Sequence, residues 1–138
     1  MTGFVLDVSV TMAWHFEDEA TPALWALLDR LLEEGVAVPG LWPLEVANVL
    51  AMGERRGRST PAKMAAFVEQ LARLPVDVDD ESAERALRET LAIARREALT
   101  AYDACYLELA LRRGLPLATS DRGMRQAAHK LGVPLLPV

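Results

Sequence analysis

Short, almost wholly apolar runs alternate with helix-length segments along these 138 residues. The runs lack the polar alternation of a strand with one solvated face, so each is expected to be covered on both faces. They span residues 4–8, 36–39, 76–78, 115–119 and 133–136, of which 76–78 is the least defined. Apolar side chains recur at helical spacing over about 21–34, 43–57, 60–71, 80–97, 100–113 and 122–131. This order predicts an α/β, three-layer fold, in which a short parallel sheet of four to five strands carries helices on both faces.

The length fits a single domain over residues 1–138, and the charge restricts its partners. Fifteen basic and twenty acidic residues give a net charge of −5, which argues against a broad basic surface for nucleic acid. The charge does not exclude an enzyme that meets phosphate through bound divalent cations. The sequence has no charge-free apolar stretch of membrane-spanning length, no basic leader and one cysteine, Cys105. We therefore expect a cytoplasmic protein without a membrane span.

Four carboxylates occupy positions where the apolar pattern predicts burial or an edge of the sheet. Asp7 interrupts the run FVLDV, and a buried carboxylate must be neutralised, paired or bound to metal. Glu45 lies in the first turn of the helix that follows the second strand by a short loop. Asp103 heads the apolar stripe of a late helix, and Asp121 follows the strand over 115–119. Each of the four is therefore a candidate functional group.

Each position also has a purely structural interpretation. Asp7 can be a structural acid at the end of a strand, and Glu45 can interact with the helix dipole. Asp103 has the spacing of a capping box, and Asp121 can be an N-cap. Asn48 lies one turn after Glu45 and is expected to form a hydrogen bond with it. The polar side chains expected to support the acids are Ser9, Asn48, Thr119 and Ser120. Taken singly, the acids leave structural and functional roles open.

Taken together, the four acids point to a cation site. A parallel sheet brings the carboxyl ends of its strands to one edge, where ligands bind in open α/β folds. Asp7, Glu45 and Asp121 are expected at that edge, and Asp103 joins them from an adjacent helix. Like charges this close cannot all stay ionised without cations, and oxygen ligands select Mg²⁺, or Mn²⁺ in its place, over zinc. Such a site typically hydrolyses phosphodiesters.

Four stretches of the chain resemble a known family. FVLDVSV, LEVANVL, LTAYDACYLELA and LATSDRGM follow one another over nearly the whole length. They resemble the PIN-domain ribonucleases, specifically the VapC-type toxins of toxin–antitoxin pairs. The resemblance implies a PIN-like fold and a Mg²⁺-dependent endoribonuclease, the toxin component of a type II pair. Such an enzyme cleaves RNA phosphodiester bonds with metal-activated water.

The resemblance also implies site residues and partners. The family's four acids fall on Asp7, Glu45, Asp103 and Asp121, and its small hydroxyl positions on Ser9 and Thr119. It implies a cognate VapB-like antitoxin that covers the acidic groove, an RNA substrate and a homodimer. Exposed apolar residues of the helices within about 42–74 are expected to form the dimer contact. Arg122 and Arg125, near the last acid, are the candidate phosphate contacts.

Three other functions compete with this interpretation. A PIN-like nuclease that acts on DNA, or processes RNA outside a toxin–antitoxin pair, has the same acids. A receiver-type signalling domain also places acids around Mg²⁺, but it needs a lysine just after a late strand. Lys63 and Lys130 both fall in predicted helices, which disfavours this alternative. A non-catalytic partner-binding domain is distinguished by whether the protein binds Mn²⁺.

Overall fold

The sheet has four strands, all parallel, in the order β3-β2-β1-β4. The structure is a computed structural model, and it describes residues 2–138 apart from the side chain of Glu17. The strands are β1 (Phe4–Leu6), β2 (Val36–Val38), β3 (Val76–Val78) and β4 (Leu117–Ala118). Val5 of the inner strand β1 pairs with Ala37 of β2 and with Leu117 of β4. The sheet is thus short, and its carboxyl ends share one edge.

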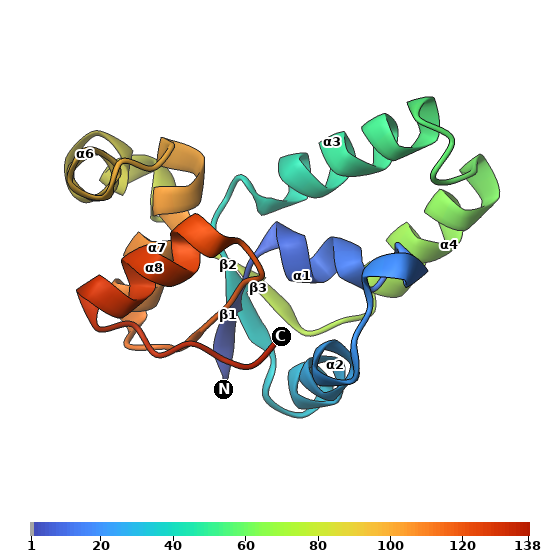
Figure 1. The fold of residues 1–138 in the computed structure, drawn as a ribbon, viewed down its shortest axis with the longest axis horizontal. Coiled ribbons are helices and arrows are strands. Elements are labelled where there is room, and N and C mark those ends of the chain that lie inside the picture. Colours follow the sequence, from blue (N-terminus) through green and yellow to red (C-terminus); the bar gives the residue numbers. More distant parts are fainter. Residues whose placement is uncertain (1) are drawn as a thin grey trace.

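Helices cover both faces of this sheet and complete a three-layer α/β fold (Figure 1). They are α1 (Val8–Ala13), α2 (Pro22–Glu34), α3 (Trp42–Arg55), α4 (Pro61–Leu71), α5 (Ser82–Arg85), α6 (Leu91–Glu97), α7 (Ala101–Arg113) and α8 (Arg122–Leu131). A 3-10 turn, Glu17–Glu19, precedes α2, and a π-helical turn, Ala86–Thr90, joins α5 to α6. Helices α7 and α8 pack together on one side of the sheet, whereas α1 packs against α3.

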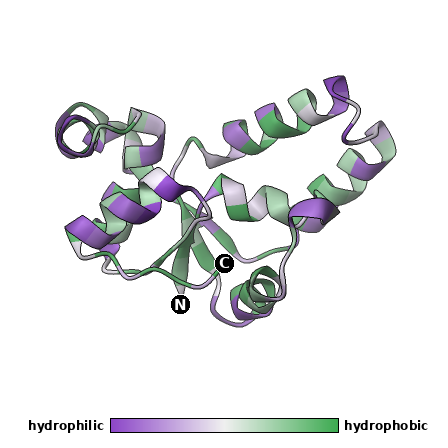
Figure 2. Ribbon diagram, in the orientation of Figure 1, coloured by the Kyte–Doolittle hydropathy of each residue, from purple (hydrophilic) through white to green (hydrophobic). Residues whose placement is uncertain are grey.

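The core sits between the sheet and these helices. Every residue of β1 and β2 is buried, which explains why both strands are apolar throughout. Figure 2 shows the hydrophobic strands at the centre and the hydrophilic stretches along the helices. Thr21, Thr60 and Thr100 cap α2, α4 and α7 through their side-chain oxygens, as their positions in the sequence favour. None of the helices in residues 2–138 is long and apolar enough to cross a membrane.

Two of the expected strands differ in the structure. The predicted first strand ends at Leu6, because Val8 begins helix α1. The run VSVT is rich in β-branched residues, so the sequence does not indicate this helix. The predicted strand over 133–136 is reduced to one isolated parallel bridge, Leu117 to Leu135. Pro134 lacks an N–H group, so it cannot donate to a continuous ladder. The sheet therefore has four strands in the described part of the chain.

Candidate active site

Chain topology delivers the predicted acids to the carboxyl edge of the sheet. Asp7 follows β1 directly, and its backbone N–H donates to the carbonyl of Ala118 in β4 at 3.0 Å. Asp121 lies three residues after β4 and is the N-cap of α8. Glu45 is in the first turn of α3, which follows β2, and Asp103 is in the first turn of α7. Adjacent strands β2, β1 and β4 therefore position three of the four acids.

Asp7 is held by two hydroxyl groups. Its side chain is buried, and Oδ2 accepts hydrogen bonds from Ser9 Oγ at 2.5 Å and from Thr119 Oγ1 at 2.8 Å. Burial raises the pKa of the Asp7 carboxyl above its ordinary value, and the two hydroxyls oppose that shift. Ser9 Oγ also accepts the N–H of Ser120, and Thr119 Oγ1 accepts the N–H of Asp121, both at 3.1 Å. This network joins Asp7 to the turn that carries Asp121.

Glu45 is held by a tyrosine that the sequence pattern does not single out. The hydroxyl of the fully buried Tyr106 donates to Glu45 Oε1 at 2.5 Å. Burial raises the pKa of Glu45, and the charges of Asp7 and Asp103 raise it further, while the hydrogen bond lowers it. Tyr106 follows Asp103 by one helical turn of α7, so the two share a helix face. That spacing is the sequence signal by which Tyr106 can be found.

Asp103 and Asp121 combine structural and electrostatic roles. The N–H of Asp103 donates to Thr100 Oγ1 at 3.1 Å, so threonine supplies the cap of α7. Burial raises the pKa of the Asp103 carboxyl, and the charges of Asp121 and then Asp7 add to the effect. Asp121 Oδ2 accepts the N–H of Met124 at 2.9 Å, which confirms the N-cap interpretation. The cap does not remove its charge, which is still felt at Asp103.

The four acids repel one another without a basic partner. In residues 2–138, no arginine or lysine forms a salt bridge with Asp7, Glu45, Asp103 or Asp121. Asp7, Glu45 and Asp103, whose pKa values are raised, and Asp121, the N-cap of α8, form an all-oxygen donor set that suits a hard divalent cation. The residues present therefore fit Mg²⁺ or Mn²⁺.

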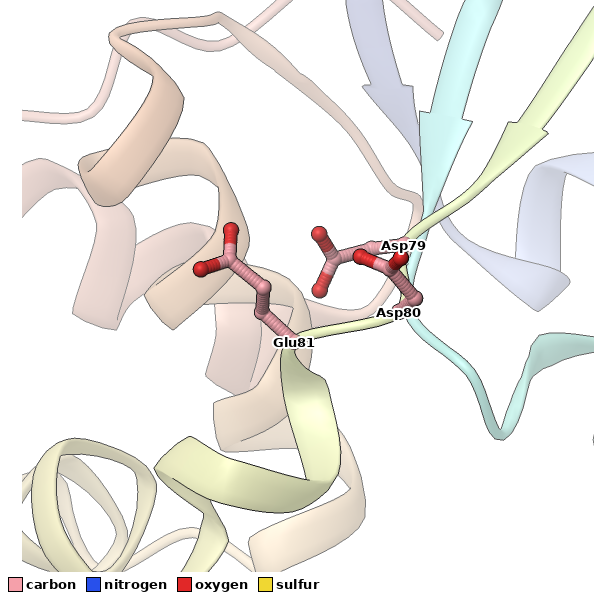
Figure 3. Close-up of side chains that lie close together, drawn as sticks. All are labelled: Asp79, Asp80 and Glu81. Carbon is pink, nitrogen blue, oxygen red and sulfur yellow. The ribbon is translucent and has the colours of Figure 1, made fainter.

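A tighter acidic cluster lies at the end of β3, and two of its three acids are paired with arginine. Asp79, Asp80 and Glu81 are the one group in the described residues whose ligand oxygens all lie within 4.8 Å of one another (Figure 3). The buried Asp79 accepts from Arg112 at 2.8 Å and from Arg113 at 2.9 Å. These guanidinium groups hold the pKa of Asp79 far below its ordinary value. We therefore assign this cluster to an ion-pair network that anchors α7.

The predicted supporting residues are placed unequally. Ser9 and Thr119 contact Asp7, whereas Ser120 contributes its backbone N–H to the network. The prediction that Asn48 forms a hydrogen bond with Glu45 is wrong. The Asn48 side chain is exposed, and the Tyr106 hydroxyl donates to Glu45 instead. Tyr106 reaches Glu45 from the core, whereas Asn48 lies on the exposed side of α3.

The two predicted phosphate contacts lie on α8. Arg125 donates to the carbonyls of Thr119 at 2.8 Å and Leu136 at 3.4 Å, which fixes its guanidinium group beside the β4–α8 turn. Arg122 is exposed. A surface hollow of about 570 Å³ runs along this helix. Its lining residues are Ser120, Arg122, Arg125, Gln126, His129 and Lys130. The hollow is thus basic and begins beside the last acid.

Comparison with known proteins agrees with this geometry. The family model for the PIN domain matches residues 4–130. The chain is 34% identical over 112 residues to Ribonuclease VapC3 of Mycobacterium tuberculosis, covering 78% of this chain and 77% of that protein. The crystal structure of PAE2754 from Pyrobaculum aerophilum superposes with a TM-score of 0.69 at 26% identity, over 97% of this chain and 83% of that one. That of FitAcB from Neisseria gonorrhoeae gives a TM-score of 0.63 at 20% identity, over 97% and 96%. The chain therefore belongs to the PIN-domain family, in the group of VapC-type proteins.

Proposed function

We propose that this protein is a metal-dependent endoribonuclease, the toxin of a type II toxin–antitoxin pair. The observation that carries the proposal is the set of four acids without a basic partner, at the carboxyl edge of a PIN-domain sheet. The name of its relative, Ribonuclease VapC3, supports RNA as the substrate. Neither lysine lies just after β4, since Lys63 is in α4 and Lys130 is in the last turn of α8, so a receiver-type domain is disfavoured.

Each acid has a distinct task in this proposal. Asp7, Asp103 and Asp121 would hold Mg²⁺, or Mn²⁺ in its place, and Glu45 would hold a second ion or orient the attacking water. When bound, the cation supplies an activated water and neutralises the charge that develops at phosphorus. Ser9 and Thr119 fix Asp7 through Oδ2. Tyr106 fixes Glu45 through Oε1, which leaves Oε2 to accept a proton from water or to take part in ion binding.

The basic hollow on α8 would hold the RNA backbone. Arg122 and Lys130 are exposed there, and Arg125 is fixed by the carbonyl of Thr119, which also supports Asp7. Arginine binds phosphate oxygens in a bidentate manner. An RNA strand bound in this hollow would lie next to Asp121, so the protein can bind RNA despite its net charge of −5.

Cleavage should depend on the divalent cation. We expect purified protein to cut structured RNA with Mg²⁺ or Mn²⁺ and to lose that activity in EDTA, because the cation supplies the activated water and neutralises the charge that develops at phosphorus. Gel analysis of an RNA panel, with a matching DNA panel, measures both cation and substrate dependence. Undiminished RNA cleavage in EDTA contradicts the mechanism, and preference for DNA contradicts the substrate assignment.

A cytoplasmic homodimer and a VapB-like antitoxin complete the proposal. The antitoxin would cover the acidic groove with a basic side chain. Leu44 on α3 and Val68 on α4 are exposed apolar residues within the segment assigned to the dimer. Light scattering should therefore give about twice the chain mass of 15.2 kDa. A monomer that persists at micromolar concentrations contradicts the dimer.

A further inference from the structure

A second hollow, of about 410 Å³, shares no lining residue with the hollow on α8. It is formed where the loop after β2 meets α5, the π-helical turn and the start of α7. Leu41, Ala83, Ala86 and Ala101 give it largely apolar walls, and Tyr102 forms part of its rim. It is therefore unlike the basic hollow on α8 in both composition and position.

This hollow is within one helical turn of two of the proposed metal ligands. Tyr102 directly precedes Asp103. The carbonyl of Leu41 accepts the N–H of Glu45 at 3.0 Å in the first turn of α3. A group seated between Tyr102 and Leu41 is thus adjacent to a phosphate that lies at the acids.

The walls suit a neutral, flat and partly polar group. Tyr102 is 66% exposed, although aromatic side chains usually bury most of their surface. Ser82 and Thr90 also line the hollow and add hydroxyl groups to its apolar walls. Asp103, a carboxylate without a basic partner among the described residues, directly follows Tyr102, so a second phosphate in this hollow would be repelled.

We propose that this hollow binds the nucleobase next to the scissile phosphate, stacked on Tyr102. The inference rests on the proposed ribonuclease function and specifies its substrate as an unstacked, single-stranded position. Proteins commonly read RNA in this way, by stacking splayed bases on aromatic side chains. The basic hollow on α8 holds phosphates, and the apolar hollow holds a base.

The test compares Tyr102→Ala and Tyr102→Phe on a short single-stranded RNA whose cut site has been mapped with the wild type. Stacking is worth about a tenfold effect or more per base, so Tyr102→Ala should lower kcat/KM by roughly that factor, mainly through KM. Tyr102→Phe, which keeps the ring, should retain wild-type cleavage. Leu111→Ala removes an exposed apolar side chain at the other end of α7 and should leave cleavage unchanged.

An abasic substrate separates base stacking from other roles of Tyr102. Removing the base beside the cut should cost the wild type the same factor and cost Tyr102→Ala nothing further, because the two changes delete one interaction. Additive losses, or wild-type cleavage by Tyr102→Ala, overturn the base site while the ribonuclease function stands. Loss of antitoxin binding with unchanged RNA cleavage assigns the hollow to a protein partner and also overturns it. If the wild type cleaves no RNA, both proposals fail.

Discussion

Asp7→Asn should lower RNA cleavage about a thousandfold, because removing one preorganised polar group from an active site slows an enzyme by about that factor. Its fold should survive, because Asn keeps an oxygen that can accept from Ser9 and Thr119. The apo protein should be as stable as the wild type or more so, since the buried Asp7 charge is unfavourable without a cation. Cleavage rates and denaturant unfolding in EDTA measure the two effects.

The stability that the apo protein gains on Asp7→Asn depends on pH, because the pKa of Asp7 is raised in the folded state. Between the ordinary value of 3.8 and the raised folded value, the native state holds a proton that the unfolded chain has lost. The wild type therefore loses unfolding free energy as pH rises through that window, and Asp7→Asn lacks this contribution, whereas the raised pKa values of Glu45 and Asp103 act in both proteins. The advantage of the variant should be absent below pH 3.8 and complete above the window.

The control is Asp29→Asn, which alters an exposed acid on α2 that forms no ion pair among the described residues. It should change neither cleavage nor stability. An Asp7→Asn protein that unfolds much more readily in EDTA would mean that the carboxylate is a structural strand-end acid. The loss of activity would then be a folding defect.

Local signals account for most of the fold. Thr21 with Pro22 and Thr60 with Pro61 mark helix starts that depend only on neighbouring backbone groups, and Gly114 ends α7 with positive φ. The unbroken apolar runs of β1 and β2 predict strands covered on both faces, which their burial confirms. The alternation of strands and helices along the chain predicts that the strands of the sheet run parallel.

Tertiary context accounts for the elements that differ. Helix α1 is rich in β-branched residues, and its packing against α3 overrides their local preference. The predicted helix over 80–97 contains the π-helical turn Ala86–Thr90, which its apolar spacing does not reveal.

The site shows the same division between local and distant information. Ser9 lies two residues from Asp7, so its contact is predictable from adjacency. Tyr106 is 61 residues from Glu45, and no local pattern joins them. The four acids themselves are found because parallel strands share a carboxyl edge, a rule of topology that needs no side-chain detail. Their assignment as metal ligands stays a prediction.

Mn²⁺ should raise the melting temperature of the wild type by several degrees. A ligand that binds only the native state stabilises it by roughly 2.7 kcal/mol at a hundred times Kd. For a domain of this size, that corresponds to a shift on the order of 5–10 °C. Asp103→Asn keeps the cap of α7, because the Thr100 hydroxyl supplies it, but removes a proposed ligand. It should fold normally and respond little to the ion.

Four thermal melts test the metal site most directly: wild type and Asp103→Asn, each in EDTA and in millimolar Mn²⁺. In EDTA the variant should melt at or above the wild-type temperature, because it lacks one of the mutually repelling charges. With Mn²⁺ the wild type should melt clearly higher than in EDTA, and the variant should not. Equal responses to Mn²⁺ in the two proteins would show that Asp103 is a helix-start acid and that the four carboxylates do not form the metal site.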